Sequence, residues 1–185
     1  MLFVLDICVT QSYILRMDQD RLFNLVAAFS TAVNDKLDAE FAATGRHGGA
    51  GPAAFATLYA TPGLSIDRLA RTLRLSSSGA VRLVDRLSAD GLAERRAGAT
   101  ARDVSVWLTA SGEGAARDVL ASRARSIAAL LDGMNERELQ QLGRLVERAL
   151  GTRKLERDEA ETICRLCDIS ACAPDDCPVE LAVER

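Results

Sequence analysis

The sequence lacks the residue patterns on which most enzymes depend. It contains a single histidine, His47, and we find no glycine-rich nucleotide-binding motif, no Ser/His/Asp arrangement and no paired catalytic carboxylates. His47 lies in the glycine-rich stretch GRHGGAG, which is typical of a solvated loop. These absences argue against an enzyme and favour a protein that acts by binding a partner.

Long hydrophobic runs and a basic N-terminal start are missing as well. The first sixteen residues, MLFVLDICVTQSYILR, form a short apolar run that is interrupted by Asp6 and has no positively charged beginning. Such a segment makes a poor signal peptide and is too short to span a membrane. We therefore expect a cytoplasmic protein without membrane association. Residues 1–16 are either an extension of a helical bundle or lie upstream of the natural start.

The whole chain has no excess of positive charge. Its 23 lysines and arginines are outnumbered by 26 acidic residues, which gives a net charge of −3. At 185 residues the chain is long enough for one domain with a real core, and its 48% hydrophobic residues exclude wholesale disorder. Only 4% of the residues are aromatic. Residues 65–109 differ from this average, because eight arginines against five acidic residues give a local charge of +3. That sign suits phosphate groups.

Two short helices are predicted in this arginine-rich segment. Ser65 is a natural N-cap, and apolar residues follow it at helical spacing: Ile66, Leu69, Ala70 and Leu73. Three serines at residues 76–78 open a second helix, which Gly91 ends. The apolar stripe of this second helix consists of Ala80, Leu83, Val84 and Leu87. The last serine falls with Arg82 and Asp85 on the opposite face, so the outer face is polar and carries arginine.

A β-hairpin is predicted directly after the second helix. Residues 92–96 and the alternating Val104, Val106 and Leu108 give two strand-like runs around a small turn that contains glycine. Helix, helix and hairpin in this order form a winged helix-turn-helix.

These elements place suitable side chains for binding duplex DNA. Hydroxyl and backbone N–H groups at a helix N-terminus can hold phosphate oxygens, and an arginine farther along the exposed face, Arg82, can reach guanine in the major groove. Arginines of the hairpin can lie along the backbone or enter the minor groove, and Arg102 is nearest the tip. The alternative is a solvated face whose arginines pair with Asp85. The predicted DNA-binding residues are Ser76, Ser77, Ser78, Arg82, Arg86, Arg95 and Arg102.

This segment resembles the MarR family of winged helix-turn-helix transcriptional regulators. The resemblance extends over about residues 21–150 and is most specific in LSSSGAVRLVDRLSADGLAERR (residues 75–96) and VWLTASGEG (residues 106–114). In that family the first stretch forms the recognition helix and first wing strand, and the second forms the last wing strand and the start of a long helix. The resemblance implies a homodimer on a pseudo-palindromic operator, usually a repressor released by a ligand or by oxidation. Small phenolic or aromatic effectors are common in the family.

The chain departs from that family's pattern in the wing and in the second helix. The wing commonly carries Asp-Arg-Arg, where this chain has Thr100, Ala101 and Arg102 in a wing one residue shorter, so only Arg102 carries over. Val81 stands where threonine is frequent, which removes one hydrogen bond to a base or phosphate. The changed wing leaves an alternative open, a winged-helix interaction module that does not bind DNA.

Amphipathic patterns flank the winged segment on both sides. One has its apolar residues at spacings of three and four: Leu22, Val26, Phe29, Val33, Leu37 and Phe41. Two more are predicted at about residues 111–131 and 136–150. We interpret these as helices that pack across a twofold axis, with packing inside a monomer as the alternative. The predicted fold class is mainly α with a small β-hairpin wing, a winged helix-turn-helix with N- and C-terminal dimerisation helices.

This interpretation divides the chain into five segments. They are an N-terminal extension (1–16), a dimerisation helix with the first core helix (17–60), the winged helix-turn-helix (61–110), the C-terminal dimerisation helices (111–155) and an acidic, cysteine-rich tail (156–185).

Four of the five cysteines gather in the tail, whereas Cys8 stands alone. Cys164, Cys167, Cys172 and Cys177 have the spacing C-x2-C-x4-C-x4-C, and four thiolates can complete a tetrahedral metal site. Zinc is the simplest occupant, although a proline directly after the last cysteine is also a feature of iron–sulfur cysteine runs. A thiol redox switch and unrelated free thiols are the other interpretations. Permanent disulfides are not expected, because nothing marks the chain as secreted.

Two hypotheses of function follow from the tail. We expect it to pack near the dimer helices and to couple metal or redox state to the spacing of the recognition helices. The rival from another class is a small metal- or thiol-based redox protein. Nucleic-acid binding by the tail itself is not expected, because acidic residues surround the cysteines and would repel phosphate.

Overall fold

The computed structural model describes residues 3–43, 49–97, 104–172 and 175–184, and in the first helix the side chains of residues 18–42. Helices predominate and a small antiparallel sheet completes the fold, so the predicted fold class is confirmed. The elements in chain order are α1 (Phe3–Ala43), α2 (Gly51–Ala60), β1 (Leu64–Ser65), α3 (Ile66–Thr72), α4 (Ser77–Ala89), β2 (Ala93–Ala97), β3 (Val104–Leu108), α5 (Ala110–Leu130), α6 (Glu136–Gly151), α7 (Arg157–Cys164) and α8 (Pro178–Leu181).

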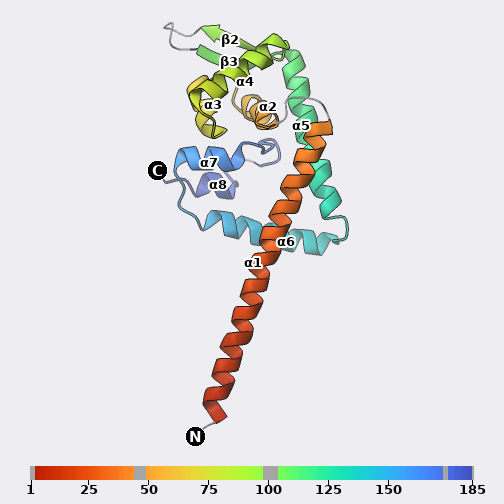
Figure 1. The fold of residues 1–185 in the computed structure, drawn as a ribbon, viewed down its shortest axis with the longest axis vertical. Helices are drawn as coiled ribbons and strands as arrows, with labels where there is room; N and C mark the ends of the chain where they lie inside the picture. Colours follow the sequence, from red (N-terminus) through yellow and green to blue (C-terminus); the bar gives the residue numbers. More distant parts are fainter. Residues whose placement is uncertain (1–2, 44–48, 98–103, 173–174, 185) are drawn as a thin grey trace.

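The winged helix-turn-helix lies at one end of the molecule (Figure 1). There α2, α3 and α4 pack together beside the sheet, and α5 leads from the sheet down to α6. The short helices α7 and α8 lie between α3 and α6, where α7 contacts α3 and α8 contacts α6. Helix α1 packs against α5 near its C-terminal end, and its N-terminal part extends away from the rest of the chain. Helix α1 runs without a break through residue 16, where the N-terminal extension was predicted to end.

Local signals in the sequence set the ends of the two central helices. The Ser65 hydroxyl accepts a hydrogen bond from the Arg68 backbone N–H at 3.2 Å, and this caps α3. The Ser76 hydroxyl accepts one from the Gly79 N–H at 3.1 Å and caps α4. Gly91 follows α4 with a φ of +70°, a backbone conformation that glycine adopts readily and that suits the turn into the wing.

The main core lies beneath α4 and the sheet. The four apolar residues that were predicted to form the stripe of α4 are all 2% exposed or less: Ala80, Leu83, Val84 and Leu87. They pack with Phe55 and Leu58 of α2, Leu69 of α3 and Val106 of β3. Burying this stripe fixes the rotation of α4 about its own axis, so its polar face is directed outward.

The sheet has three strands, one more than the predicted hairpin. The order is β1, β3, β2, with Arg95 of β2 opposite Val106 of β3 and Leu64 of β1 on the other side of Val106. Sequence patterns do not predict β1, because two residues are too few to show an alternation of apolar and polar side chains. In the part of the chain that the structure describes, we find no helix with the length and hydropathy needed to cross a membrane.

A test of the fold concerns the contact between the start of α5 and the turn after α4. A Cβ atom built on Gly112 would lie 1.9 Å from the Leu92 carbonyl oxygen, whereas one built on Gly114 would meet its nearest atom at 4.0 Å. Gly112→Ala is therefore expected to lower the free energy of unfolding by about 1–3 kcal/mol or more, as measured by urea denaturation. Gly114→Ala, the control in the same helix, should raise it by about 0.5–1 kcal/mol. Equal stability of the two variants would contradict this packing.

Candidate nucleic-acid interface and cysteine tail

The N-terminus of α4 is an exposed, hydroxyl-rich end of a helix. Ser76, Ser77 and Ser78 are all exposed, and the hydroxyls of Ser76 and Ser78 lie 3.3 Å apart. Ser76 also caps the helix, so its oxygen accepts a hydrogen bond from the backbone. The helix dipole and the first N–H groups favour an anion at such an end. The structure therefore brings the three predicted serines together on the surface.

Arg82 and Arg86 project from the outer face of α4, one turn apart. Both side chains are exposed and border a surface hollow together with Asp85 and with residues 49 and 50 in front of α2. Within the described part of the chain, neither arginine forms an ion pair with another residue. Their charges are thus available to a partner outside the chain.

The arginines of the wing strand β2 are engaged within the protein. Arg95 forms a 2.7 Å ion pair with Asp85 of α4, which ties the wing to the second helix. Arg96 pairs with Glu94 at 2.6 Å and lies over the Trp107 ring, 4.3 Å from the ring centroid. Among the described residues, Asp85 is thus paired with Arg95 of the wing and not with an arginine of its own helix.

The tip of the wing falls outside the described residues. Residues 98–103 include Thr100, Ala101 and Arg102, so the minor-groove contact expected of Arg102 stays a prediction. His47 belongs to residues 44–48, which also lie outside the described residues, so its expected place in a solvated loop stays a prediction.

The cysteine tail docks on α3, the helix that precedes α4. Glu161 of α7 accepts two hydrogen bonds from the Arg68 guanidinium, with Nε at 3.2 Å from Oε2, and a third from the Thr72 hydroxyl at 3.2 Å. These contacts lower the pKa of Glu161, chiefly through the hydrogen bond from Arg68, and the same hydrogen bond raises the pKa of Arg68. Asp158 adds a more exposed ion pair with Arg71, at 3.2 Å.

Sequence reasoning missed this docking contact. Arg68 and Arg71 were counted in the local charge that faces phosphate, whereas the structure pairs both with carboxylates some ninety residues farther along the chain. The only signal in the sequence is the acidic composition of the tail, which does not identify a partner. Among the described arginines of the winged segment, Arg74, Arg82 and Arg86 form no ion pair, and two of these three lie on α4.

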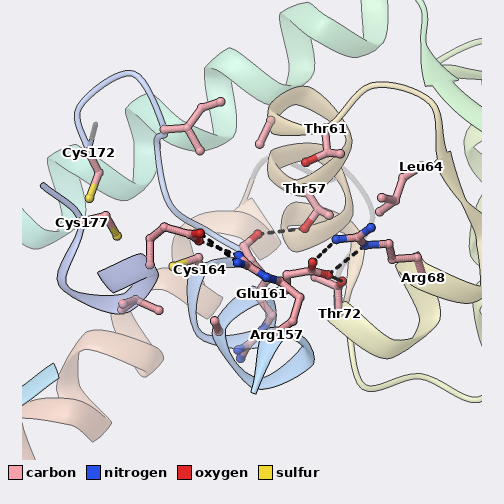
Figure 2. Close-up of a pocket in the computed structure, with 16 residues that line it drawn as sticks. Thr57, Thr61, Leu64, Arg68, Thr72, Arg157, Glu161, Cys164, Cys172 and Cys177 are labelled. Carbon is pink, nitrogen blue, oxygen red and sulfur yellow. Dashed lines mark hydrogen bonds and ion pairs between the residues drawn. The ribbon is translucent and has the colours of Figure 1, made fainter. Parts of the chain in front are cut away.

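A cavity of about 350 Å³ lies between the tail and the helix-turn-helix, beside the contact of Glu161 with Arg68 (Figure 2). Cys164, Cys172 and Cys177 lie at one end of it, and Arg68 with Leu64 lies at the other, as Figure 2 shows. Its lining is mainly apolar, and the guanidinium groups along it are paired within the protein.

The thiols of the tail affect one another's pKa in two pairs. Interaction with Cys167 raises the pKa of Cys164, and interaction with Cys177, the N-cap residue of α8, raises the pKa of Cys172. The hydrogen bond within the first pair raises the pKa of Cys164, an effect to which burial adds, and lowers the pKa of Cys167. Among the described residues, no three or more His, Cys, Asp and Glu side chains are arranged as a finished metal site. The predicted zinc site therefore stays a prediction.

Comparisons with known proteins identify the winged segment. Residues 53–103 match the sequence profile MarR_2, described as MarR family. A search of curated proteins gives no match.

Solved structures similar to this chain share the fold over most of their length. They include YusO from Bacillus subtilis, with 21% identity, 74% of this chain and 96% of that chain covered and a TM-score of 0.62. A MarR-family transcriptional regulator from Silicibacter pomeroyi has 26% identity, coverage of 72% and 90% and a TM-score of 0.56. MepR, a transcription regulator of the Staphylococcus aureus multidrug efflux pump MepA, has 20% identity, coverage of 69% and 95% and a TM-score of 0.60.

The match to the MarR family agrees with the expectation that the chain is not an enzyme, because the similar protein from Silicibacter pomeroyi is a transcriptional regulator of that family. The resemblance to the MarR family is confirmed: residues 53–103 match the model of that family, and the chain shares the winged-helix fold of the MarR-family regulator from Silicibacter pomeroyi.

Proposed function

We propose that the protein is a homodimeric transcriptional regulator that binds double-stranded DNA and represses from a pseudo-palindromic operator. The observation that carries this proposal is the surface of α4, where exposed serines stand at the N-terminus and Arg82 and Arg86 follow on the outer face. This surface lies in the segment that matches the MarR family, and the similar MarR protein of Listeria monocytogenes is a multiple antibiotic-resistance repressor.

The geometry of α4 suits the major groove. Its 13 residues make a helix of roughly 20 Å, and its N-terminal turn is free of covering elements among the described residues. Serine hydroxyls and N–H groups of that turn would hold a phosphate, which fixes the helix on the duplex. Arg82, one turn before Arg86, would then offer its fork of donors to guanine O6 and N7.

A homodimer follows from the uncovered apolar face of α1. Leu37 and Phe41 are buried against the rest of the chain, but the same stripe continues toward the N-terminus with side chains that are 44–57% exposed: Leu22, Phe23, Leu25, Val26 and Phe29. Helix α6 also exposes apolar side chains: Leu139, Leu145 and Val146. Apolar side chains exposed along helices in this way mark a protein interface, and a second copy related by a twofold axis matches a palindromic operator.

The rest of the proposal concerns how DNA binding is controlled. We propose zinc as the cofactor of the four tail cysteines, with an iron–sulfur cluster or thiol–disulfide exchange as the alternatives that metal analysis separates. A small-molecule effector is the other proposed control, and the largely apolar cavity of about 350 Å³ offers it room. A cytoplasmic location goes with this function, because the operator DNA lies there.

Arg82→Ala tests the role of α4. Loss of a bidentate contact to guanine should weaken binding to the preferred DNA by about 1–3 kcal/mol and relax the preference at one base-pair position. DNA selected from a random library by the wild-type protein would serve as ligand, with fluorescence anisotropy as the measurement. The control is Arg153→Ala, which removes the same charge from the segment between α6 and α7, where Arg153 pairs with Glu159. Equal losses for the two variants would contradict a base contact by Arg82.

Val26→Glu tests the dimer. A carboxylate in the middle of the exposed stripe should be repelled from an apolar interface, so light scattering should report a monomer and DNA affinity should fall with the loss of paired half-sites. Asn24→Glu is the matched control, because residue 24 lies on the opposite face of α1 and is already polar and exposed. A Val26→Glu protein that stays dimeric would overturn this assignment of the interface.

A further inference from the structure

Arg74, in the turn between α3 and α4, is held in a backbone conformation that an arginine rarely adopts. Its φ is +53°, and in the described part of the chain it is the only residue other than glycine with a positive φ. This left-handed region brings the Cβ atom of an L-residue close to the following carbonyl oxygen, so it costs free energy at every residue except glycine. Strain of this kind persists where function requires it, and Arg74 is therefore a candidate functional residue.

Backbone hydrogen bonds impose this conformation on Arg74. The Leu75 N–H donates to the Ala70 carbonyl at 2.9 Å. The Arg74 N–H donates to the Arg71 carbonyl at 3.0 Å. The two bonds together form a Schellman motif at the C-terminal end of α3, in which the residue after the cap is left-handed and is usually glycine. Arg74 thus occupies a glycine position.

The same motif ends α4 with the usual residue. There the Leu92 N–H donates to the Leu87 carbonyl at 2.8 Å. The Gly91 N–H donates to the Ser88 carbonyl at 3.0 Å, and Gly91 has a φ of +70°. Both turns have the same hydrogen-bond pattern, but only the turn in front of α4 carries a long cationic side chain. The motif itself does not require that side chain, because glycine satisfies it at lower cost.

The Arg74 side chain is directed away from the core. Its neighbours Leu73 and Leu75 both pack on the main core, whereas Arg74 is exposed. Leu75 also borders the surface hollow that Arg82 and Arg86 line. With the described residues, the Arg74 side chain forms neither an ion pair nor a hydrogen bond. Its charge is thus free, on the side of the molecule where α4 presents its arginines.

Arg74 also lies just in front of the N-terminal end of α4. It precedes the capping residue Ser76 by two positions, so the two Cα atoms are at most about 7 Å apart. A phosphate at that helix end would meet the dipole and the first N–H groups of α4 on one side. A guanidinium group is well suited to bind the same phosphate from another side, because it is always charged and can donate to two oxygens at once.

We propose that Arg74 holds a backbone phosphate of the bound duplex against the N-terminus of α4, and that the left-handed turn directs its guanidinium group to this phosphate. The inference rests on the proposed DNA-binding function. It adds a residue outside the set predicted from the sequence. A contact with the backbone positions the helix in the groove but carries no sequence information, so the role of Arg74 differs from the base contact proposed for Arg82.

Arg74→Gly tests this role, because glycine keeps the turn and removes the charge. The full-length variant should be more stable than the wild type, with an equilibrium constant for unfolding that is roughly 5-fold smaller by urea denaturation. Its affinity for the DNA selected by the wild-type protein should fall roughly 10- to 100-fold at about 0.1 M salt, measured by anisotropy. The slope of log affinity against log salt should become shallower by about 2, because each protomer loses one phosphate contact.

Three further variants accompany this test. Arg74→Lys keeps a positive charge in the same backbone conformation, so it should restore the salt slope and most of the affinity. Arg74→Asn, with a side chain that tolerates the left-handed region, should repeat the loss of affinity and serves if the glycine variant does not fold. Arg153→Ala removes one positive charge between α6 and α7 and should change neither the affinity nor the slope.

Two results would refute the role of Arg74 and leave the proposed function intact. One is an Arg74→Gly protein whose DNA affinity and salt slope equal those of the wild type, whether its stability rises or falls. The other is a loss of affinity that is confined to one base-pair position, since that indicates a base contact. A wild-type protein that binds no DNA at any salt concentration would refute the proposed function and this inference together.

Discussion

The burial of one apolar stripe on α4 determines what the surface of the protein can do. Ala80, Leu83, Val84 and Leu87 are almost completely inaccessible, and burying each larger side chain contributes about 1.5–3 kcal/mol. Turning the helix about its axis would expose this stripe and push Arg82 and Arg86 toward the core, where unpaired charges are very unfavourable. The packing beneath α4 therefore fixes the direction of the arginines above it, and no other element has to hold them there.

Ion pairs within the protein engage several described arginines of the winged segment, so few of them are left to bind a partner. Arg95 is bound by Asp85 and Arg96 by Glu94, while Arg68 and Arg71 hold the acidic helix α7. The tail thus uses positive charge that would otherwise face phosphate, and two of its carboxylates, Glu161 and Asp158, are paired with α3. This arrangement reconciles a chain of net charge −3 with a local surface that suits nucleic acid.

Local signals made much of this architecture predictable. Ser65, Ser76 and Gly91 mark helix ends through their own backbone and side-chain chemistry, and the stripe of α4 follows from its spacing. Contacts between distant segments left no such signal. The docking of Glu161 on Arg68 joins residues 93 positions apart, and nothing in the cysteine spacing indicates that Leu166 packs on the main core. The spacing identified a group of thiols, but the division of these thiols into two pairs depends on the folded tail.

The central claim is that two outward-facing α4 helices, one from each protomer, read successive major grooves of one duplex. Hydroxyl-radical footprinting of the full-length protein on DNA selected from a random library tests this most directly. The account predicts two protected stretches, centred about 10–10.5 base pairs apart and related by the twofold axis of the site. Protection of a single stretch, or no recovery of DNA above that of a protein with an unrelated fold, would contradict it.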